Sequence, residues 1–526
     1  MIPRLFDRFS LEKEAQRKAN KRKGRIACAA GATARGAPLL KKWTKQSRNV
    51  SANTVRDKSK FYTLENYYEN MYCDGSVVKY CNKNAENPRS RGYIFKNNFP
   101  RSLYVAQGLR LRNRISMRRR ENCKIHFKEG EDLPLTIYIQ HTRAYVMNKI
   151  CYLDNAATSF PKPASVIREV SNCLSNYCGN AGRGAHKLSL YSANKIYECR
   201  ELICVLVNAP TPENIAFVPS CTFGLNLIAK GVLKQGDHVI LSDMEHNAVL
   251  RPLAKLKSNG IISYNTFPAL SNPHQSVDQL LEGICSRIKK NTKLVICTHQ
   301  SNVCSYSLPL EKIGALCKEN HILFAVDCAQ SAGHLPIDMQ KMGINFLAAP
   351  AHKGLYGLQG GAFVAINSPT LLDTLIEGGN GINSLDLNMG EIIPERYEAG
   401  TLPLPSIVGL TEGIKFLNSR SLKDIRAHER DLFCRARDGL LNINGATVYA
   451  SEFEGSTLLF NLKDINAQRV CALLDENNVC VRSGFHCAPL AHKSLGTDKT
   501  GAVRISFGLF NTKYDVDQLL TVLDKF

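Results

Sequence analysis

Strand-like and helix-like segments alternate along most of this 526-residue chain, starting near Met147. Short runs rich in apolar and β-branched residues predict strands at 214–220, 238–244, 293–299, 322–328, 344–350 and 361–367. Between them, residues 276–290 and 310–320 repeat apolar positions with the period of an amphipathic helix. This alternation predicts an α/β domain with a mainly parallel sheet over residues 147–410.

The pattern changes near residue 411. An amphipathic helix is predicted over 406–420 and a shorter strand over 456–462. We therefore expect a smaller α+β domain over residues 411–526. The first residues after Met147 are assigned to the large domain, although they could instead join the small one.

Residues 1–146 lack sustained periodicity and carry most of the positive charge. They hold 32 Lys and Arg against 12 Asp and Glu, a net charge of +20, whereas residues 147–526 hold 36 against 34, a net charge of +2. This composition predicts a basic, disordered extension, and any binding of nucleic acid would be confined to it. An organelle-targeting segment and a stretch upstream of a folded protein that starts at Met147 remain alternatives.

The cysteines indicate a reducing compartment, which we take to be the cytoplasm. Of the 19 cysteines, 15 follow Met147, and several, such as Cys204 and Cys297, lie inside apolar runs typical of buried free thiols. We expect few or no disulfides. No apolar run reaches the ~18–20 residues that cross a bilayer, and no Cys or His spacing predicts a metal site.

Polar residues follow several predicted strands, where ligands of open α/β sheets bind. Cys221 and Thr222 open a predicted helix and suit a phosphate group, while His246, Asp327 and Lys353 each follow a strand. Singly, Asp327 is explained as a helix cap and Lys353 as a solvated lysine. Together they suit pyridoxal phosphate, because an amine forms its Schiff base, an acid holds its pyridinium proton and an aromatic ring stacks on it.

The chain from about Met147 to Phe526 also resembles a known family. The motifs are "YLDNAATSFPKP", "SCTFGLNLIAKG", "DMEHNAVLRP", "THQSNVCS", "VDCAQSAGH", "AHKGLYGLQG", "YEAGT", "RSGFHCAPLAHKSLGT" and "VRISFGLFNT". They are similar to those of class V aminotransferases and, within these, of SUF-type (group II), selenocysteine lyase-like cysteine desulfurases. The resemblance implies PLP-dependent transferase fold type I, a homodimer, L-cysteine as substrate and a sulfur-acceptor protein as partner.

The resemblance also implies a set of site residues. The catalytic ones would be Lys353 as the Schiff-base lysine, Cys487 as the nucleophile and His246 on the cofactor ring. The cofactor would be held by Cys221, Thr222, His246, Asp327, Gln330, His352, Lys353, Gly400 and Thr401, the last two reaching across a dimer interface. The substrate would be held by Asn302, Arg482 and Arg504.

Two positions depart from the family pattern. Pro350 replaces a phosphate-binding serine and has neither hydroxyl nor N–H, so Cys221 or Thr222 is expected to supply that contact. Phe485 stands where relatives often carry histidine, which affects how the loop delivers protons. We expect His486 and Arg482 to supply positive charge that raises the thiolate fraction of Cys487.

The implied activity is removal of sulfur from L-cysteine, giving L-alanine and a persulfide on Cys487 for iron–sulfur cluster assembly or another sulfur-using pathway. Two alternatives share the fold: a selenocysteine lyase, and a class V aminotransferase that does not use Cys487. A third is of another class, an RNA-associated sulfur carrier that uses residues 1–146.

Overall fold

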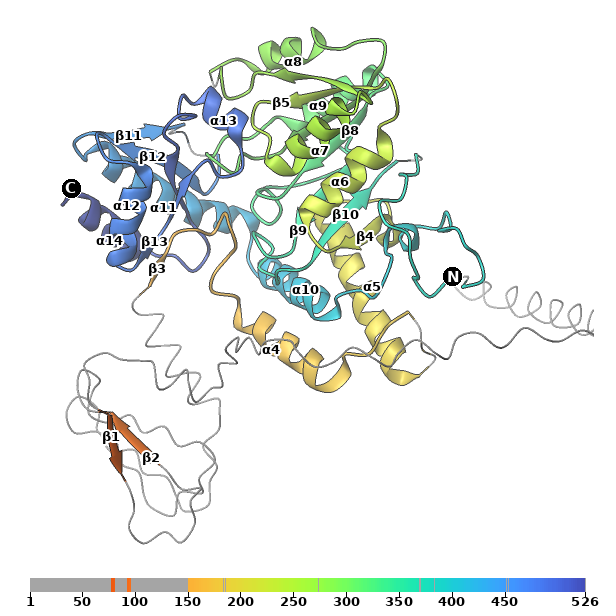
Figure 1. Cartoon of the computed structure of the whole chain (residues 1–526), viewed down its shortest axis with the longest axis horizontal. Helices are drawn as coiled ribbons and strands as arrows, with labels where there is room; N and C mark the ends of the chain where they lie inside the picture. The colour runs from red at the N-terminus through yellow and green to blue at the C-terminus, as the bar shows by residue number, and fades with distance from the viewer. Residues whose placement is uncertain are drawn as a thin grey trace, which may run out of the picture. The chain divides into compact units, whose positions relative to one another are not determined.

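The computed structural model describes residues 150–525, except 183, 185, 273, 369, 383, 451 and 453 (Figure 1). It also describes two earlier strands. The chain divides into two units, Met1–Asp132 and Leu133–Phe526. In the first unit, β1 (Val77–Tyr80) and β2 (Gly92–Phe95) pair antiparallel. The disorder, RNA binding and targeting considered for residues 1–146 otherwise lie outside the described residues.

A seven-stranded sheet forms the centre of the second unit. Its strands are β4 (Ile215–Val218), β5 (His238–Ser242), β6 (Ser263–Phe267), β7 (Thr292–Thr298), β8 (Leu323–Asp327), β9 (Phe346–Pro350) and β10 (Ala362–Ile366). Their order is β4-β10-β9-β8-β7-β5-β6. β10 pairs antiparallel with both β4 and β9, and the other neighbouring pairs are parallel. The α/β fold and all six predicted strands are therefore confirmed.

Strand β6 was not predicted, and its exposure at one edge of the sheet explains why, whereas β4 at the other edge is fully buried. β6 is an edge strand of sequence SYNTF, and only Phe267 is fully buried. The central strands are buried on both faces and read as continuous apolar runs, whereas an edge strand tolerates polar side chains. Its sequence therefore lacks the apolar run that marks the other strands.

Helices cover both faces of this sheet. They are α4 (Ala164–Asn172), α5 (Lys187–Val207), α6 (Cys221–Val232), α7 (Asn247–Ser258), α8 (Val277–Cys285), α9 (Leu310–Glu319) and α10 (Leu404–Asn418), with short helical turns at Cys173–Tyr177, Pro212–Asn214 and Glu395–Tyr397. Successive residues of β7 enter different cores: Val295 packs with α5, α8 and α9, and Ile296 packs with α6 and α7. This two-sided burial is typical of parallel sheets.

A smaller sheet of order β11-β12-β15-β14 follows in the chain. It comprises β11 (Ala446–Tyr449), β12 (Thr457–Leu462), β14 (Arg482–Gly484) and β15 (Ala502–Ser506), and it shares a separate core with α11 (Leu422–Leu441), α12 (Ala467–Glu476) and α14 (Lys513–Leu523). A short helix, α13 (Pro489–Ser494), follows β14. No helix of the described residues has the length and apolarity to span a bilayer.

The first described residues belong with this smaller sheet. β3 (Cys151–Tyr152) pairs in parallel with β13 (Val479–Cys480), and Asp154 bridges to Ser506. The chain then crosses to α4, which packs against α10. One N-terminal segment thus runs between the two sheets, past the carboxyl edge of the larger one (Figure 1).

Candidate active site

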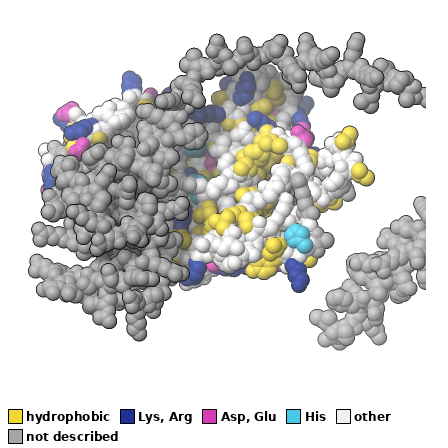
Figure 2. Space-filling view, turned by 60° about the horizontal axis from the view of Figure 1, so that its bottom comes forward, with side chains coloured by type: hydrophobic (Ala, Val, Ile, Leu, Met, Phe, Trp, Pro, Cys, Tyr) yellow, Lys and Arg dark blue, Asp and Glu magenta, His cyan; other side chains and the backbone are white. Residues whose placement is uncertain are grey.

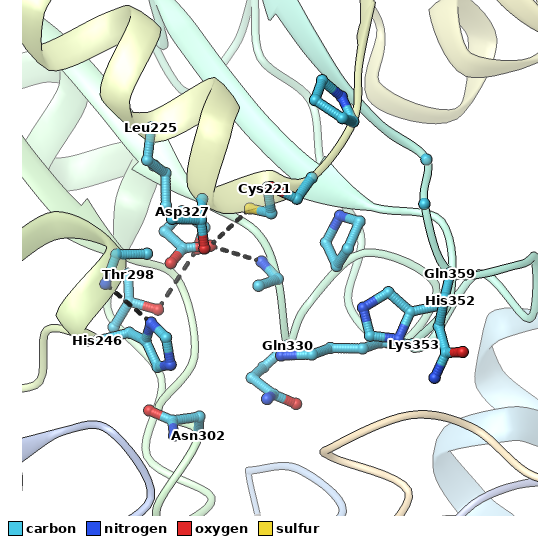
Figure 3. Close-up of a pocket in the computed structure, with 18 residues that line it drawn as sticks. Cys221, Leu225, His246, Thr298, Asn302, Asp327, Gln330, His352, Lys353 and Gln359 are labelled. Atoms are coloured by element: carbon cyan, nitrogen blue, oxygen red, sulfur yellow. Dashed lines mark hydrogen bonds between the residues drawn. The ribbon is translucent and has the colours of Figure 1, made fainter. Parts of the chain in front are cut away.

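A cavity of about 160 Å³ lies at the carboxyl edge of the large sheet (Figure 3). Among the predicted site residues, it is lined by Cys221, Thr222, His246, Asn302, Asp327, Gln330, His352 and Lys353. Pro350 lines it too. The remaining predicted residues, Gly400, Thr401, Arg482, Cys487 and Arg504, are not among the cavity-lining residues of the described chain.

Asp327 ends β8 at the floor of the cavity and is 3% exposed. Its Oδ1 accepts the N–H of Ala329 at 2.9 Å and the thiol of Cys221 at 3.6 Å (Figure 3). Burial raises the pKa of Cys221 well above its usual value, and the nearby Asp327 carboxylate adds to this. Cys221 is therefore a protonated thiol whose contact is the carboxylate.

Lys353 lies in the turn that follows the buried strand β9. Burial lowers the pKa of its amine, while the negative charge of Asp327 acts in the opposite direction. Desolvation disfavours the ammonium form, so Lys353 has a larger fraction of free amine at neutral pH than an exposed lysine. A free amine is what nucleophilic or general-base chemistry requires.

His246 is fixed by its position as the N-cap of α7. Its Nδ1 accepts the N–H of Ala248 at 3.0 Å. An imidazole whose Nδ1 accepts carries its proton on Nε2 when neutral, and burial lowers the pKa of His246, which favours the neutral form. The ring thus presents one defined tautomer to the cavity.

The start of α6 provides a site for an anion. Ser220 caps the helix, its Oγ accepting the N–H of Phe223 at 3.2 Å. Cys221 and Thr222 begin the first turn, where backbone N–H groups have no partner within the helix and the helix dipole favours negative charge. These backbone groups are the hydrogen-bond donors that an anion in the cavity would find, whereas Pro350 offers none.

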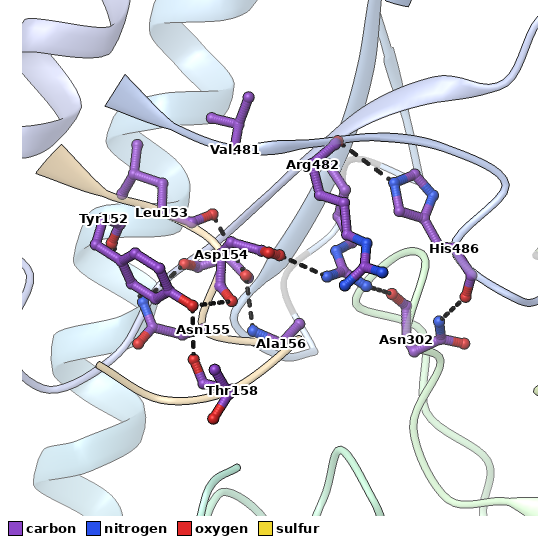
Figure 4. A network of polar contacts seen from close by, with 12 residues as sticks. Tyr152, Leu153, Asp154, Asn155, Ala156, Thr158, Asn302, Val481, Arg482 and His486 are labelled. Carbon is purple, nitrogen blue, oxygen red and sulfur yellow. Dashed lines mark hydrogen bonds and ion pairs between the residues drawn. The ribbon is translucent and has the colours of Figure 1, made fainter. Parts of the chain in front are cut away.

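The loop between β14 and α13 carries Cys487, whose side chain is exposed. His486 and Cys487 both have left-handed backbone, with φ of 46° and 56°. Asn302 Nδ2 donates to the His486 carbonyl at 2.6 Å (Figure 4). The Asn247 N–H donates to the Cys487 carbonyl at 2.7 Å. Since Asn302 lines the cavity and Asn247 follows a lining residue, the thiol loop is attached to the cavity rim.

A chain of buried side chains lies behind the thiol. Thr497 Oγ1 is 2.7 Å from His492 Nδ1, His492 Nε2 is 3.1 Å from His486 Nδ1, and His486 Nε2 is 3.4 Å from the Arg482 carbonyl. Every acceptor is satisfied when the Thr497 hydroxyl donates to His492 and each ring donates onward. Burial lowers the pKa of His486 to about 3 and that of His492 to about 4, and the positive charge of Arg504 acts in the same direction.

His486 is therefore neutral at pH 7, which corrects the expectation that it supplies positive charge to Cys487. Sequence neighbours suggested a cation, but burial and hydrogen bonding decide the charge of an imidazole. Arg504 and Arg482 both act electrostatically on His486, and Arg482 is exposed.

These histidines predict acid sensitivity of the fold. A histidine with a lowered folded pKa stabilises the protein fully above its unfolded pKa of about 6.5, and that stability is lost as pH falls toward the folded value. From pH 6.5 to about 4, we expect His492 to make unfolding easier by up to about 1.4 kcal/mol per pH unit. Urea titrations at pH 7 and pH 4.5 measure this loss. His492→Leu should show a smaller pH dependence than the wild type, and an equal one would contradict the assignment.

Two arginines lie opposite each other beside the cavity. Arg504 of β15 pairs in register with Arg482 of β14. Arg504 is 3% exposed, forms an ion pair with Asp154 at 2.7 Å and donates to the Asn302 carbonyl at 2.9 Å, but its buried Nε has no partner. Like charges directly opposite are unfavourable across strands, and a bound carboxylate would offset this.

Sequence reasoning gave no role to the side chains of the segment that contains Asp154. Asp154 and Asn155 lie in this segment (Figure 4). Besides the Asp154–Arg504 pair, the Ala156 carbonyl accepts Gln330 Nε2 at 3.0 Å, and Asn155 Nδ2 donates to the Ser506 carbonyl at 3.1 Å. The motif "YLDNAATSFPKP" was visible in the sequence. Its partners lie far away along the chain, so the motif alone could not reveal them.

Gly400 and Thr401 are exposed and separate from the cavity of their own chain. The preceding Glu398 is held by a buried ion pair with Arg200 at 2.7 Å, and it accepts the N–H of Phe217 at 2.7 Å. This pair fixes the base of the loop. A contact of Gly400 and Thr401 with another subunit stays a prediction.

Comparisons with known proteins agree with this geometry. The Aminotransferase class-V family profile matches residues 151–519. A probable cysteine desulfurase of Pyrococcus abyssi is 31% identical over 405 residues, which cover 75% of this chain and 96% of the relative. A probable cysteine desulfurase of Halalkalibacterium halodurans is 31% identical over a match that covers 72% of this chain and 93% of the relative.

Solved structures give the same result. The apo cysteine desulfurase of Thermococcus onnurineus NA1 superposes with a TM-score of 0.67 at 28% identity, covering 75% of this chain and 98% of that one. The Escherichia coli cysteine desulfurase CsdA, in an S-sulfonic acid form, superposes with a TM-score of 0.65 at 25% sequence identity. The match covers 73% of this chain and 97% of that one. The class V aminotransferases and the cysteine desulfurases are both pyridoxal phosphate-dependent families. The chain belongs to the class V aminotransferases of PLP fold type I and, within them, to the cysteine desulfurases.

Proposed function

We propose that this chain removes sulfur from L-cysteine, releasing L-alanine and leaving a persulfide on Cys487, and that it does so with pyridoxal phosphate in the cavity. One observation carries the proposal. Lys353 and the buried Asp327 face a single cavity, and the loop of the exposed Cys487 is hydrogen-bonded to its rim. The SUF-type branch is part of this proposal.

The donor set of the cavity fits the cofactor. The Asp327 carboxylate suits a pyridinium nitrogen, His246 a ring face, and the free N–H groups of α6, with Thr222 and His352, a phosphate. Gln330 donates its amide N–H to Ala156, which leaves its oxygen for a ring hydroxyl. Bound pyridoxal phosphate supplies an aldehyde that joins to amines and a ring that accepts electrons from the substrate carbon.

The chain's own residues account for the remaining steps. Arg504 and Arg482 hold the carboxylate of L-cysteine, with Asn302 beside them. The free amine of Lys353 removes the Cα proton, which its lowered pKa permits. The Cys487 thiolate then attacks the sulfur of the substrate. An S–S bond forms between Cys487 and the substrate sulfur as the C–S bond breaks, and the electron pair of the C–S bond goes to Cβ. Cβ is then protonated, and Lys353 returns its proton to Cα, which completes alanine.

A homodimer is part of the proposal, because Gly400 and Thr401 are exposed and do not line the cavity of their own chain. Figure 2 shows hydrophobic side chains on the face that lies at the bottom of Figure 1, where α4 and α5 are seen. Exposed apolar residues there include Ile167, Leu188, Leu190, Tyr191 and Tyr197. We propose a second copy on this face, a sulfur-acceptor protein at the exposed Cys487, and iron–sulfur cluster assembly in the cytoplasm as a destination for the sulfur.

The activity is tested by supplying the purified, cofactor-saturated protein with L-cysteine, L-selenocysteine or an amino donor with a 2-oxo acid. We expect alanine and sulfide from L-cysteine in equal amounts when a reducing thiol is present. Turnover of L-selenocysteine alone would identify a selenocysteine lyase. Transfer of an amino group without sulfide would identify an aminotransferase.

The N-terminal extension provides a further prediction. Since the first described strand of the second unit begins at Cys151, a protein that starts at Met147 should fold, bind cofactor and keep full activity. Circular dichroism, cofactor content and alanine formation measure this. A gel-shift assay with tRNA tests the RNA-associated alternative, which requires that the full chain binds and the shortened one does not. An insoluble or cofactor-free product would show that the extension belongs to the enzyme.

A further inference from the structure

Four hydrogen-bond donors converge on the carbonyl oxygen of His352, the residue before Lys353. The backbone N–H of Ser159, the Ser159 hydroxyl and the Thr158 hydroxyl each lie 3.1 Å away, and Lys162 Nζ lies at 2.8 Å. A carbonyl oxygen has two lone pairs, so four donors exceed its ordinary complement. All four come from residues 158–162, the end of the motif that the proposed function left unused.

Lys162 is the unusual member of this group. Its amine is half-buried, and its second partner is the Ser159 hydroxyl at 2.8 Å. In the part of the chain that the structure describes, no carboxylate lies within ion-pair distance of it. Burial lowers the pKa of Lys162 to about 8. A desolvated ammonium without an acidic partner is costly, so a benefit elsewhere is expected to offset the cost.

The contact of Lys162 with the His352 carbonyl acts on the peptide bond between His352 and Lys353. The donors restrain the orientation of this peptide and therefore the direction in which the Lys353 side chain leaves the backbone. Thr158 Oγ1 also lies 3.1 Å from His352 Nδ1, so the same segment holds the ring of the neighbouring cavity residue. Small displacements of reacting groups cost large factors in rate, so such restraint matters at a catalytic lysine.

We propose that Lys162 is a positioning residue that holds the His352–Lys353 peptide so that the Lys353 amine meets the cofactor aldehyde. This inference rests on the proposed function, because it requires Lys353 to join the cofactor. Lysine suits the task, since its ammonium donates three hydrogen bonds from a long, flexible stem that can reach the carbonyl of a separate segment.

The test compares Lys162→Met, Lys162→Arg and the control Lys318→Met, which alters an exposed lysine of α9. Each full-length protein is saturated with pyridoxal phosphate and its bound cofactor is measured. Borohydride then fixes the cofactor to the lysine it has joined, and peptide mass spectrometry gives the modified fraction of Lys353 per bound cofactor. A merely structural role would change occupancy but leave this fraction alone.

We expect the fraction to fall severalfold in Lys162→Met and kcat to fall about tenfold with KM for L-cysteine unchanged, as for the loss of one charged hydrogen bond. Lys162→Arg should restore much of both, and Lys318→Met should match the wild type. If Lys162→Met is insoluble, Thr158→Val removes another donor to the same carbonyl and should lower the fraction.

An unchanged fraction in the soluble Lys162→Met or Thr158→Val protein would overturn the inference and leave the proposed function intact. Absence of any fixed cofactor on Lys353 in the wild type would instead overturn the proposed function, and the inference with it.

Discussion

Lys353→Ala should lose release of sulfur from L-cysteine, with alanine formation falling by about a thousandfold or more. Lys353 has two roles in the proposal, to join the cofactor and to carry the Cα proton, and general-base catalysis alone contributes about 10²–10⁴. The side chain lies in the cavity beside Asp327, and no second lysine lines that cavity in the described chain. Alanine quantification under saturating cofactor and substrate measures the effect.

Lys353→Arg provides the control for charge. Arginine keeps a positive charge next to Asp327, but its guanidinium does not deprotonate in proteins and cannot supply a free amine. It should therefore be as inactive as Lys353→Ala, while both variants keep the wild-type urea midpoint. An active Lys353→Arg protein would rule out the amine chemistry assigned here.

The sequence predicted the site wherever a short local pattern decides the structure. Asp327 and Lys353 follow buried strands, and the carboxyl ends of neighbouring parallel strands meet at one edge, so the apolar runs alone place these residues together. The same reasoning placed Cys221 at a helix start. It could not give the direction of the Cys221 thiol, which depends on packing against β8, 106 residues away.

Long-range contacts account for what the sequence could not predict. Asp154 meets Arg504 across 350 residues, and Lys162 meets the His352 carbonyl across 190. Neither contact has a local pattern, because a polar residue in a loop is as easily solvated as paired. The charge of His486 depends in the same way on burial by other segments of the chain. Its sequence neighbours therefore gave the wrong expectation that it is a cation.

Cys487→Ser should still bind pyridoxal phosphate and still change its visible absorbance when L-cysteine is added, but sulfur release should fall by at least about a hundredfold. The residues predicted to bind the cofactor and the thiol predicted to attack sulfur lie in different parts of the structure. The predicted cofactor contacts within the chain line the cavity, whereas Cys487 belongs to a loop of the smaller sheet that touches the rim through Asn302 and Asn247. Serine fits the same left-handed backbone, so binding should survive.

A hydroxyl cannot replace the thiol, because its pKa lies far above neutrality and oxygen is a poor nucleophile toward sulfur. Cys285→Ser, at another exposed cysteine, is the matched control and should turn over normally. Mass spectrometry after brief exposure of the wild type to L-cysteine should find one extra sulfur on the peptide that carries Cys487. If the sulfur resides on another cysteine, or if Cys487→Ser turns over normally, the nucleophile is misassigned, while the fold and the family, which do not depend on this thiol, would stand.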